Sequence, residues 1–181
     1  AALQPIAYFT CETFGIQMTT ASESGSIIAC IPIASLVASI LFLQKKPTRF
    51  QTSGICLTVV GVIVCVTAKG FESSFSGIGY IMLCMAVLSY SLYCVSAEKA
   101  DKTTSIEKTY VMIACGACFF ATMAIAKSIA AGTVVDLLML PFQNTVFLFS
   151  IVYLGIVSSV ISFVLFNISI SSIGTNKASS F

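Results

Sequence analysis

One carboxylate stands inside an otherwise apolar stretch near the start of the chain, at Glu12. Tyr8 precedes it and Thr19 follows it at helical spacing, so one helix face would carry a phenol, a carboxylate and a hydroxyl. Such a face can bind an amine or another polar metabolite, and the carboxylate can exchange a proton. The alternative is that Glu12 is protonated or paired and only fixes the packing of helices.

Two further polar stripes could line the same cavity. Asn167 and Ser171 lie one helical turn apart, as do Ser89 and Tyr93. Polar side chains between apolar helices often hold the helices together rather than bind a ligand, so the packing alternative applies to each of them. The candidate cavity residues are therefore Tyr8, Glu12, Thr19, Ser89, Tyr93, Asn167 and Ser171.

Pro32 lies near the middle of the second apolar stretch. A proline there removes one helical hydrogen bond and frees the carbonyl of Ile28. We interpret it as a candidate hinge beside a ligand path, with a static kink as the alternative.

Composition argues against metal and histidine chemistry. The chain has no His and no Trp, so His-based triads, His metal sites and His proton relays are excluded. Cys115 and Cys118 have the C-x-x-C spacing, but no second pair and no His completes a zinc site. The eight cysteines lie within apolar runs, where they act as small hydrophobes. No metal and no cofactor is expected.

The elements that must position these side chains are transmembrane helices. Of 181 residues, 57% are apolar and only 9% are charged, and the mean hydropathy is +1.02. In a soluble domain roughly a quarter of the residues are charged, so the low charged fraction of this chain excludes a soluble globular domain. The net charge of +2 is too small to indicate nucleic-acid binding. We therefore expect an integral, multi-pass membrane protein.

Six apolar stretches approach the ~20 residues needed to cross a bilayer. They run over 2–20, 25–43, 52–68, 76–97, 109–132 and 145–170, with a further start at 177–181. The connections 21–24, 44–51, 69–75, 98–108 and 132–144 are short, so no separate soluble domain is predicted. The predicted fold is an all-α polytopic transmembrane bundle. Because apolar stretches stand at both ends, we expect the chain to be an interior piece of a longer protein.

The cations indicate the orientation in the membrane. Alternate connections hold Lys45, Lys46 and Arg49, then Lys99, Lys102 and Lys108, then Lys177, whereas the other set holds Lys69 alone. Lys and Arg are retained on the cytoplasmic side in short loops. The connection 44–51 is therefore predicted to be cytoplasmic, and Asp136 to face outside. Lys127 is near the outer end of its helix, and its long aliphatic side chain lets the ammonium group reach the membrane–water interface.

A weak internal repeat joins the two ends of the chain. Placing Ile161 on Ile6 also aligns Thr175 with Thr20 and polar Asn167 with Glu12. The offset spans five membrane crossings, an odd number, so the two copies would be inverted in the membrane. That is the architecture of many secondary transporters. Two unrelated apolar helices are the alternative.

Several stretches, taken in order, resemble one known family. The third and fourth helices of the EamA family, in the drug/metabolite transporter superfamily, resemble residues 8–12, 17–28 and 31–33. The junction between the family's fourth and fifth helices, and the fifth helix itself, are similar to residues 42–48 and 54–62. The start of the family's second half resembles residues 77–80, and its eighth helix resembles residues 153–159. The segment Gln44-Lys45-Lys46 departs from the family pattern, because it lacks the acidic residue usual there.

The resemblance implies helices three to eight and the start of nine in a ten-helix protein of two inverted five-helix repeats. Residues 1–70 would be the C-terminal part of the first repeat, and 71–181 the N-terminal part of the second. It further implies a secondary transporter, a permease or exporter, in the bacterial cytoplasmic (plasma) membrane. The solute would be a small metabolite, amino acid or drug-like compound moved by alternating access.

The expected partners are this solute and the lipid bilayer, without nucleic acid; a coupled proton and a homodimer are left open. Two other functions stay as alternatives. A non-transporting membrane scaffold would use Glu12 only for packing. An intramembrane enzyme is disfavoured, because no His is present and because Asp101 and Asp136 both lie in predicted connections.

Overall fold

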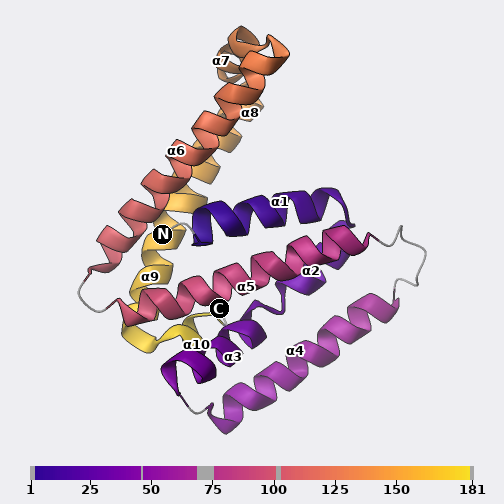
Figure 1. Ribbon diagram of the computed structural model, residues 1–181, viewed down its shortest axis with the longest axis vertical. Helices are drawn as coiled ribbons and strands as arrows, with labels where there is room; N and C mark the ends of the chain where they lie inside the picture. Colours follow the sequence, from indigo (N-terminus) through magenta and orange to yellow (C-terminus); the bar gives the residue numbers. More distant parts are fainter. Residues whose placement is uncertain (1–2, 46, 69–75, 101–102, 180–181) are drawn as a thin grey trace.

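The computed structural model describes residues 3–45, 47–68, 76–100 and 103–179, and in that part of the chain it contains helices and no strand (Figure 1). In chain order these are η1 (Leu3–Tyr8), α1 (Phe9–Gln17), α2 (Ala21–Ile28), α3 (Ile31–Leu43), α4 (Arg49–Ala68), α5 (Gly77–Lys99), α6 (Ser105–Ala131), α7 (Val134–Gln143), α8 (Thr145–Val152), η2 (Tyr153–Ile161), α9 (Ser162–Ile173) and α10 (Thr175–Ala178), where η marks π-helical turns. The predicted all-α class is confirmed.

Four helical stretches within the described residues are long and apolar enough to cross a membrane. They are Ala21–Leu43, Gly77–Lys99, Ser105–Ala131 and Thr145–Ile173. Each overlaps a predicted apolar stretch and differs from it by a few residues at its ends. The chain is thus an integral membrane protein of the helical type. The ten-helix arrangement and the division at residue 70 stay predictions.

The break at Pro32 differs from the expected kink inside one helix. α2 ends at Ile28, Ala29 and Cys30 form a turn, and Pro32 lies in the first turn of α3. Proline suits that position because its fixed φ is helical and its missing N–H is not needed in a first turn. The hinge role of this break stays a prediction.

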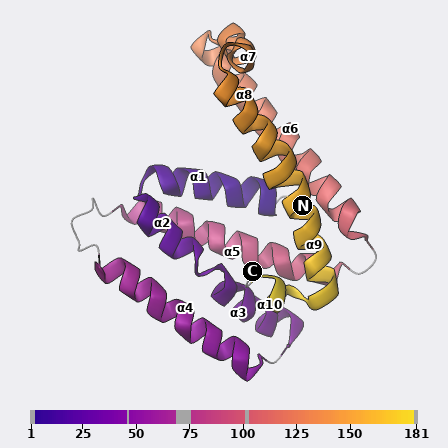
Figure 2. The ribbon, with the colours of Figure 1, turned by 180° about the vertical axis from the view of Figure 1, so that it is seen from behind.

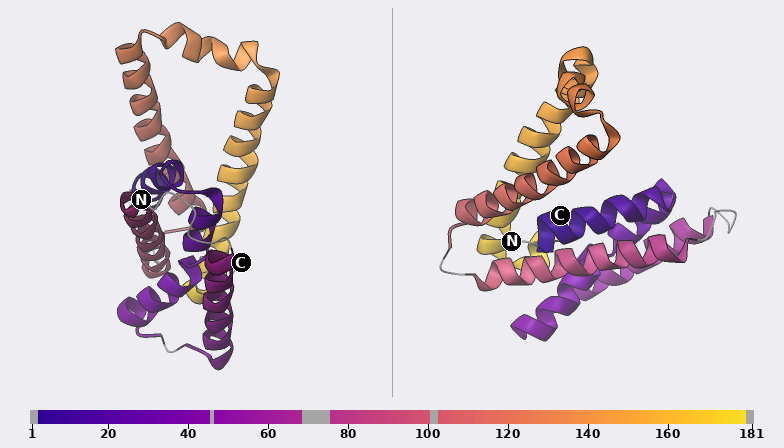
Figure 3. Two further views of the ribbon diagram at one scale, coloured as in Figure 1. Left: turned by 90° about the vertical axis from the view of Figure 1, so that its right-hand side faces the viewer. Right: turned by 45° about the horizontal axis from the view of Figure 1, so that its top comes forward.

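The connection 132–144 contains a short helix, α7, which the sequence analysis did not predict. Gly132 ends α6 in a left-handed conformation with φ of 70°, and an apolar run then forms α7 with Asp136 in its first turn. Ten residues are too few to cross a bilayer. The left view of Figure 3 shows α7 joining the far ends of α6 and α8.

Helix α5 runs alongside α1, α2 and α3, so segments far apart in the sequence pack together (Figures 1 and 2). Two glycines allow the close crossing with α1. A Cβ on Gly15 would lie 2.6 Å from Cγ of Leu83, and one on Gly79 would lie 2.7 Å from Cγ2 of Thr19. Small residues are the usual means by which membrane helices approach each other.

The contact between α3 and α5 follows the same rule with serines. Ser35, Ser39 and Ser91 are buried there, and the hydroxyls of Ser35 and Ser91 lie 3.4 Å apart within hydrogen-bonding distance. Ser91 also donates to the carbonyl of Val87 at 2.8 Å. Small hydroxyl side chains therefore let α3 pack directly on α5.

The outer part of α6 extends away from this bundle together with α7 and α8 (Figures 1 and 2). The buried residues of α6 are Thr109, Met112 and Gly116 in its first half, and Ser128 near its end. α7, α8 and η2 have no buried residue among those described. Their apolar side chains suit the hydrocarbon of a bilayer.

Candidate functional site

A cavity of about 460 Å³ lies between η1, α5 and α9, beside the break between α2 and α3. We call it the aromatic cavity, because four rings line it, those of Tyr8, Tyr90, Phe163 and Phe166. The remaining lining residues are Ile28, Ala29, Ile31, Pro32, Ser162, Ala178 and Ser179. The structure thus brings two predicted residues, Tyr8 and the hinge candidate Pro32, to one cavity.

The rings of the aromatic cavity pack against each other. The centroid of Tyr90 lies 5.3 Å from that of Tyr8 and 5.6 Å from that of Phe166, with tilted planes in both pairs. Phe163 packs edge-on against Phe9 at 6.3 Å. Tilted and edge-on contacts are the favourable geometries for aromatic pairs, so this wall is fixed by its own packing. It can accept an apolar or aromatic group, or a cation over a ring face.

Glu12 is connected to this wall by Tyr8. The phenol of Tyr8 donates a hydrogen bond of 2.7 Å to Oε1 of Glu12, one turn further along the same helical segment. Tyr8 is buried and lines the cavity, whereas Glu12 is half-buried. A group that contacts the Tyr8 ring therefore lies one hydrogen bond from the carboxylate.

The aromatic cavity also holds an unused hydrogen-bonding group. Oγ of Ser179, at the end of α10, is buried and has no hydrogen-bond partner within the described part of the chain. Buried polar atoms in proteins are nearly always paired. This hydroxyl can therefore serve a polar atom of a bound molecule.

Tyr93 and Asn167 meet in a buried network and do not belong to the lining of the aromatic cavity. The phenol of Tyr93 donates to Oδ1 of Asn167 at 2.6 Å, and Nδ2 of Asn167 donates to Oγ1 of Thr109 at 2.9 Å. Thr109 in turn donates to the carbonyl of Ser105 at 2.9 Å. The network joins α5, α9 and α6, so it fixes the packing of three helices. A contact of Tyr93 or Asn167 with solute stays a prediction.

A second cavity of about 510 Å³ lies where α3, α5 and α9 end. We call it the polar cavity; its lining is Lys45, Glu98, Thr103, Lys108, Ile170, Ser171, Ser172, Ile173 and Gly174. Predicted Ser171 lies here, with its Oγ 3.1 Å from that of Ser105. Lysines from two connections predicted to be cytoplasmic, Lys45 and Lys108, thus meet at one end of the bundle. Lys46, Lys69 and Lys102 lie outside the described residues.

The two remaining candidates lie away from both cavities. Thr19 donates to the carbonyl of Gly15 at 2.8 Å and packs on α5. It is eleven residues beyond Tyr8 in the sequence, roughly 16 Å along a helix. Ser89 is half-buried on α5 and belongs to neither lining. The seven candidates therefore do not form one site, and the role of each stays a prediction.

Sequence reasoning missed Tyr90, Phe163 and Phe166 in the aromatic cavity, and Lys45 and Glu98 in the polar one. Phe163 and Phe166 are three apart, as are Tyr90 and Tyr93, which puts each pair on one helix face. That spacing was a usable signal, but aromatic residues on apolar helices equally face lipid. Glu98 was expected in a connection, yet it lies in the last turn of α5.

Comparison with known proteins gives matches along the whole chain. Residues 1–67 match the model of the EamA-like transporter family. The protein named "Uncharacterized transporter YcxC" of Bacillus subtilis (strain 168) is 34% identical over 183 aligned positions, which cover 100% of this chain and 58% of that protein. "Protein PagO" of Salmonella typhimurium (strain LT2) is 28% identical over 101 positions, covering 54% of this chain and 33% of that protein.

This chain thus spans little more than half of the first relative and a third of the second. No solved structure gives a significant match. The apolar membrane-spanning helices, the family match over residues 1–67 and the alignment of the entire chain with a relative named as a transporter agree with one another. Residues 1–67 match the EamA-like transporter family, and the whole chain is similar to a relative named as a transporter.

Proposed function

We propose that this protein is a secondary transporter that moves a small solute across the bilayer through the aromatic cavity by alternating access. The observation that carries the proposal is the cavity of about 460 Å³ formed by η1, the α2–α3 break, α5, α9 and α10. Small-molecule sites usually measure roughly 300–1,000 Å³ and are mostly apolar with few polar groups. The aromatic cavity has that size and composition. The family match over residues 1–67 supports the same function, and a relative named as a transporter agrees with a protein that is not an enzyme.

The lining supports a solute with an apolar or aromatic portion and one polar group. The rings of Tyr90 and Phe166 offer flat apolar faces, and the unpaired hydroxyl of Ser179 offers one hydrogen bond. The lining contains no charged side chain among the described residues. A metabolite, amino acid or drug-like compound of modest size fits these features.

Glu12 supports coupling to a proton. A carboxylate on a largely apolar segment of a membrane protein is a functional candidate, and a proton is the simplest ion that it can exchange. The hydrogen bond from Tyr8 supplies the link, since the same phenol borders the cavity. We propose that solute binding and the protonation of Glu12 influence each other through Tyr8.

Alternating access needs an element that can change its shape. The break between α2 and α3 borders the aromatic cavity through Ile28, Ala29, Ile31 and Pro32, and two helix ends meet there without continuous helical bonding. We propose that this break bends while residues 1–70 and 71–181 move as inverted halves of a ten-helix protein. The bacterial relatives support the bacterial cytoplasmic membrane as the location of this protein. We also propose that the protein forms a homodimer.

Flux through liposomes tests the function. The purified full-length protein would be reconstituted and loaded in turn with amino acids, aromatic amines and neutral aromatic metabolites. We expect the release of at least one class to exceed that from protein-free liposomes, and to saturate with concentration. Release that matches protein-free liposomes for every class, from protein that elutes as a single folded species, would instead favour a non-transporting scaffold.

A further inference from the structure

Three helix ends meet at the carboxylate of Glu98, at the border of the polar cavity. Lys45, just after α3, forms an ion pair with Oε1 of Glu98. The backbone N–H of Thr175, at the start of α10, donates to Oε2 at 2.8 Å. Glu98 itself lies in the last turn of α5, and its side chain is only 13% exposed. The carboxylate of Glu98 thus links the end of α3 and the start of α10 to α5.

The turn before α10 fits closely around this ion pair. Gly174 has φ of 82°, a conformation that favours glycine, and a Cβ there would lie 3.3 Å from Oε1 of Glu98 and 3.5 Å from Nζ of Lys45. Oγ1 of Thr175 also donates to the carbonyl of Cys94, one turn before Glu98, at 3.0 Å. α10 is therefore held to the end of α5 at two points.

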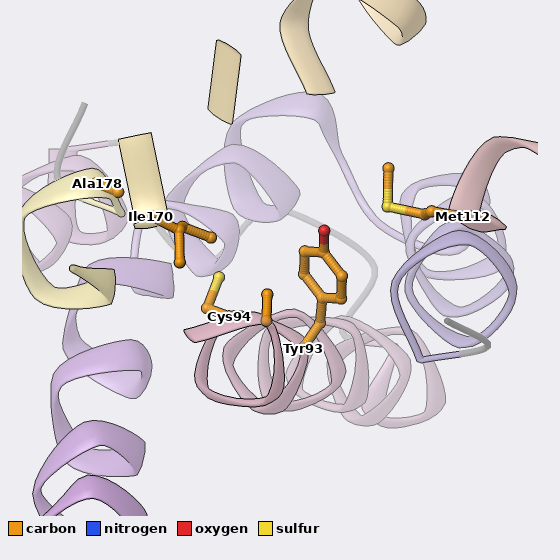
Figure 4. Packing of buried hydrophobic residues seen from close by; sticks show 6 residues of the cluster. Tyr93, Cys94, Met112, Ile170 and Ala178 are labelled. Atoms are coloured by element: carbon orange, nitrogen blue, oxygen red, sulfur yellow. The ribbon is translucent and has the colours of Figure 1, made fainter. Parts of the chain in front are cut away.

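Buried side chains next to the two cavities belong to the same helices. Tyr93, Cys94, Ile170 and Ala178 are members of one buried cluster, and Figure 4 shows Cys94, Ile170 and Ala178 grouped closely together. Ile170 lines the polar cavity, and Ala178 lines the aromatic cavity. One buried cluster, carried by α5, α9 and α10, thus borders both cavities.

We infer that the polar cavity is the mouth of the solute path at the lysine-bearing end, and that Glu98 is the latch that keeps this end closed. Releasing Glu98 from Lys45 and Thr175 frees α10, so that Ala178 can leave Ile170 and Cys94 and join the two cavities. The inference rests on the proposed function for the existence of a path, and adds the residues that hold it shut.

The exposure of the pair suits a latch that opens and closes. Lys45 is half exposed, so water competes for its ammonium group, and exposed ion pairs contribute little net stability. Glu98 is more shielded and also binds the N–H of Thr175, which gives the closed arrangement a defined geometry. Such a contact can hold the helix ends in place and still break during each transport cycle.

Thiol labelling tests the latch without knowledge of the solute. The probes are Ser179→Cys in the aromatic cavity and Ser172→Cys in the polar cavity, each in the full-length protein in membrane vesicles of both orientations. A membrane-impermeant maleimide is added outside the vesicles, and labelling of the parent protein, which carries the native cysteines, is subtracted. Labelling of Ser172→Cys identifies the vesicle side that the polar cavity faces.

From that side, we expect Ser179→Cys to react slowly in the otherwise unchanged protein. It should react at least tenfold faster with Glu98→Gln or Lys45→Gln. Glu107→Gln is the matched control, because Glu107 caps the start of α6 with Thr104 and makes no part of the latch; it should leave the rate unchanged.

Two results would overturn the latch. One is an unchanged rate for Ser179→Cys with Lys45→Gln, a change at a half-exposed side chain that leaves the cap on Thr175 in place. The other is a Ser172→Cys that is not labelled from either side. Labelling decides the latch, whereas solute flux decides the proposed function, so failure of one is distinguishable from failure of the other.

Discussion

The phenol of Tyr8 lies between the aromatic cavity and the carboxylate of Glu12, to which it donates a hydrogen bond of 2.7 Å. The ring is part of the cavity wall and packs 5.3 Å from Tyr90, centroid to centroid. A molecule seated against that wall therefore changes the surroundings of the phenol, and the phenol changes the surroundings of the carboxylate. The first prediction concerns this pair.

Glu12→Gln should lower proton-driven solute flux at least tenfold, because the amide keeps the shape of the side chain and cannot exchange a proton. Tyr8→Phe should lower flux only severalfold, since the ring stays in the wall and only the hydrogen bond is lost. The measurement is the initial uptake rate in vesicles under an imposed pH gradient. Glu107→Gln, at an exposed capping glutamate, is the control. Full proton-driven flux in Glu12→Gln would contradict the role of Glu12.

Gly15→Ala should destabilise the crossing of α1 and α5. Its Cβ would lie 2.6 Å from Cγ of Leu83, so the helices must separate or Leu83 must leave its position. Overpacking of this kind costs about 1–3 kcal/mol. The check is the Tm of the detergent-solubilised protein against Gly25→Ala on α2, where a Cβ meets nothing within 4 Å. Equal Tm values for the two variants would show that the close crossing is not formed.

Asn167→Leu should destabilise the network of α5, α6 and α9. It removes the acceptor for Tyr93 and the donor to Thr109 while keeping a similar volume. Hydrogen bonds between membrane helices contribute about 1 kcal/mol. Unfolding in mixed micelles would measure the loss, and Tyr93→Phe should show part of it. Tyr153→Phe, at a phenol that is 61% exposed, should be neutral. An Asn167→Leu protein as stable as the parent but impaired in flux would assign Asn167 to the solute instead.

The connection 44–51 should face the cytoplasm, since it carries Lys45 and Arg49 and its end of the bundle also holds Lys108. A Cys at Gln44 should react with an impermeant maleimide in inverted vesicles and not in intact cells. A Cys at Gln143, in exposed α7 at the other end of α6, should show the opposite pattern. Reversed labelling of both positions would mean that the protein is inserted the other way round.

The fold could be predicted from the sequence where a single physical signal dominates. Apolar runs of bilayer length located the spans Ala21–Leu43 and Gly77–Lys99 to within a few residues. α7 was missed because its ten residues are too short for that signal. Pro32 does lie near the middle of the span Ala21–Leu43, but in the first turn of α3 and not within one continuous helix, because a proline fits a first helical turn as well as a kink.

The candidate site was less predictable, because it depends on which distant residues meet. Tyr90 and Phe166 are 76 positions apart in the sequence, and their rings pack together in one wall. Glu98 pairs with Lys45 across 53 positions. Neither a ring on an apolar helix nor a carboxylate near a helix end reveals its partner. Helix periodicity did place Tyr8 beside Glu12, since that pair is local.

The central claim, that solute passes through the aromatic cavity, is tested most directly by filling it. Ala29 lines the cavity on the turn between α2 and α3 and is exposed, so Ala29→Trp adds an indole without displacing a buried residue. Ala124→Trp, on the exposed outer part of α6, is the matched control. In liposomes carrying equal amounts of folded protein, we predict that Ala29→Trp loses at least nine-tenths of the solute flux while Ala124→Trp keeps it. Undiminished flux in Ala29→Trp would contradict the account.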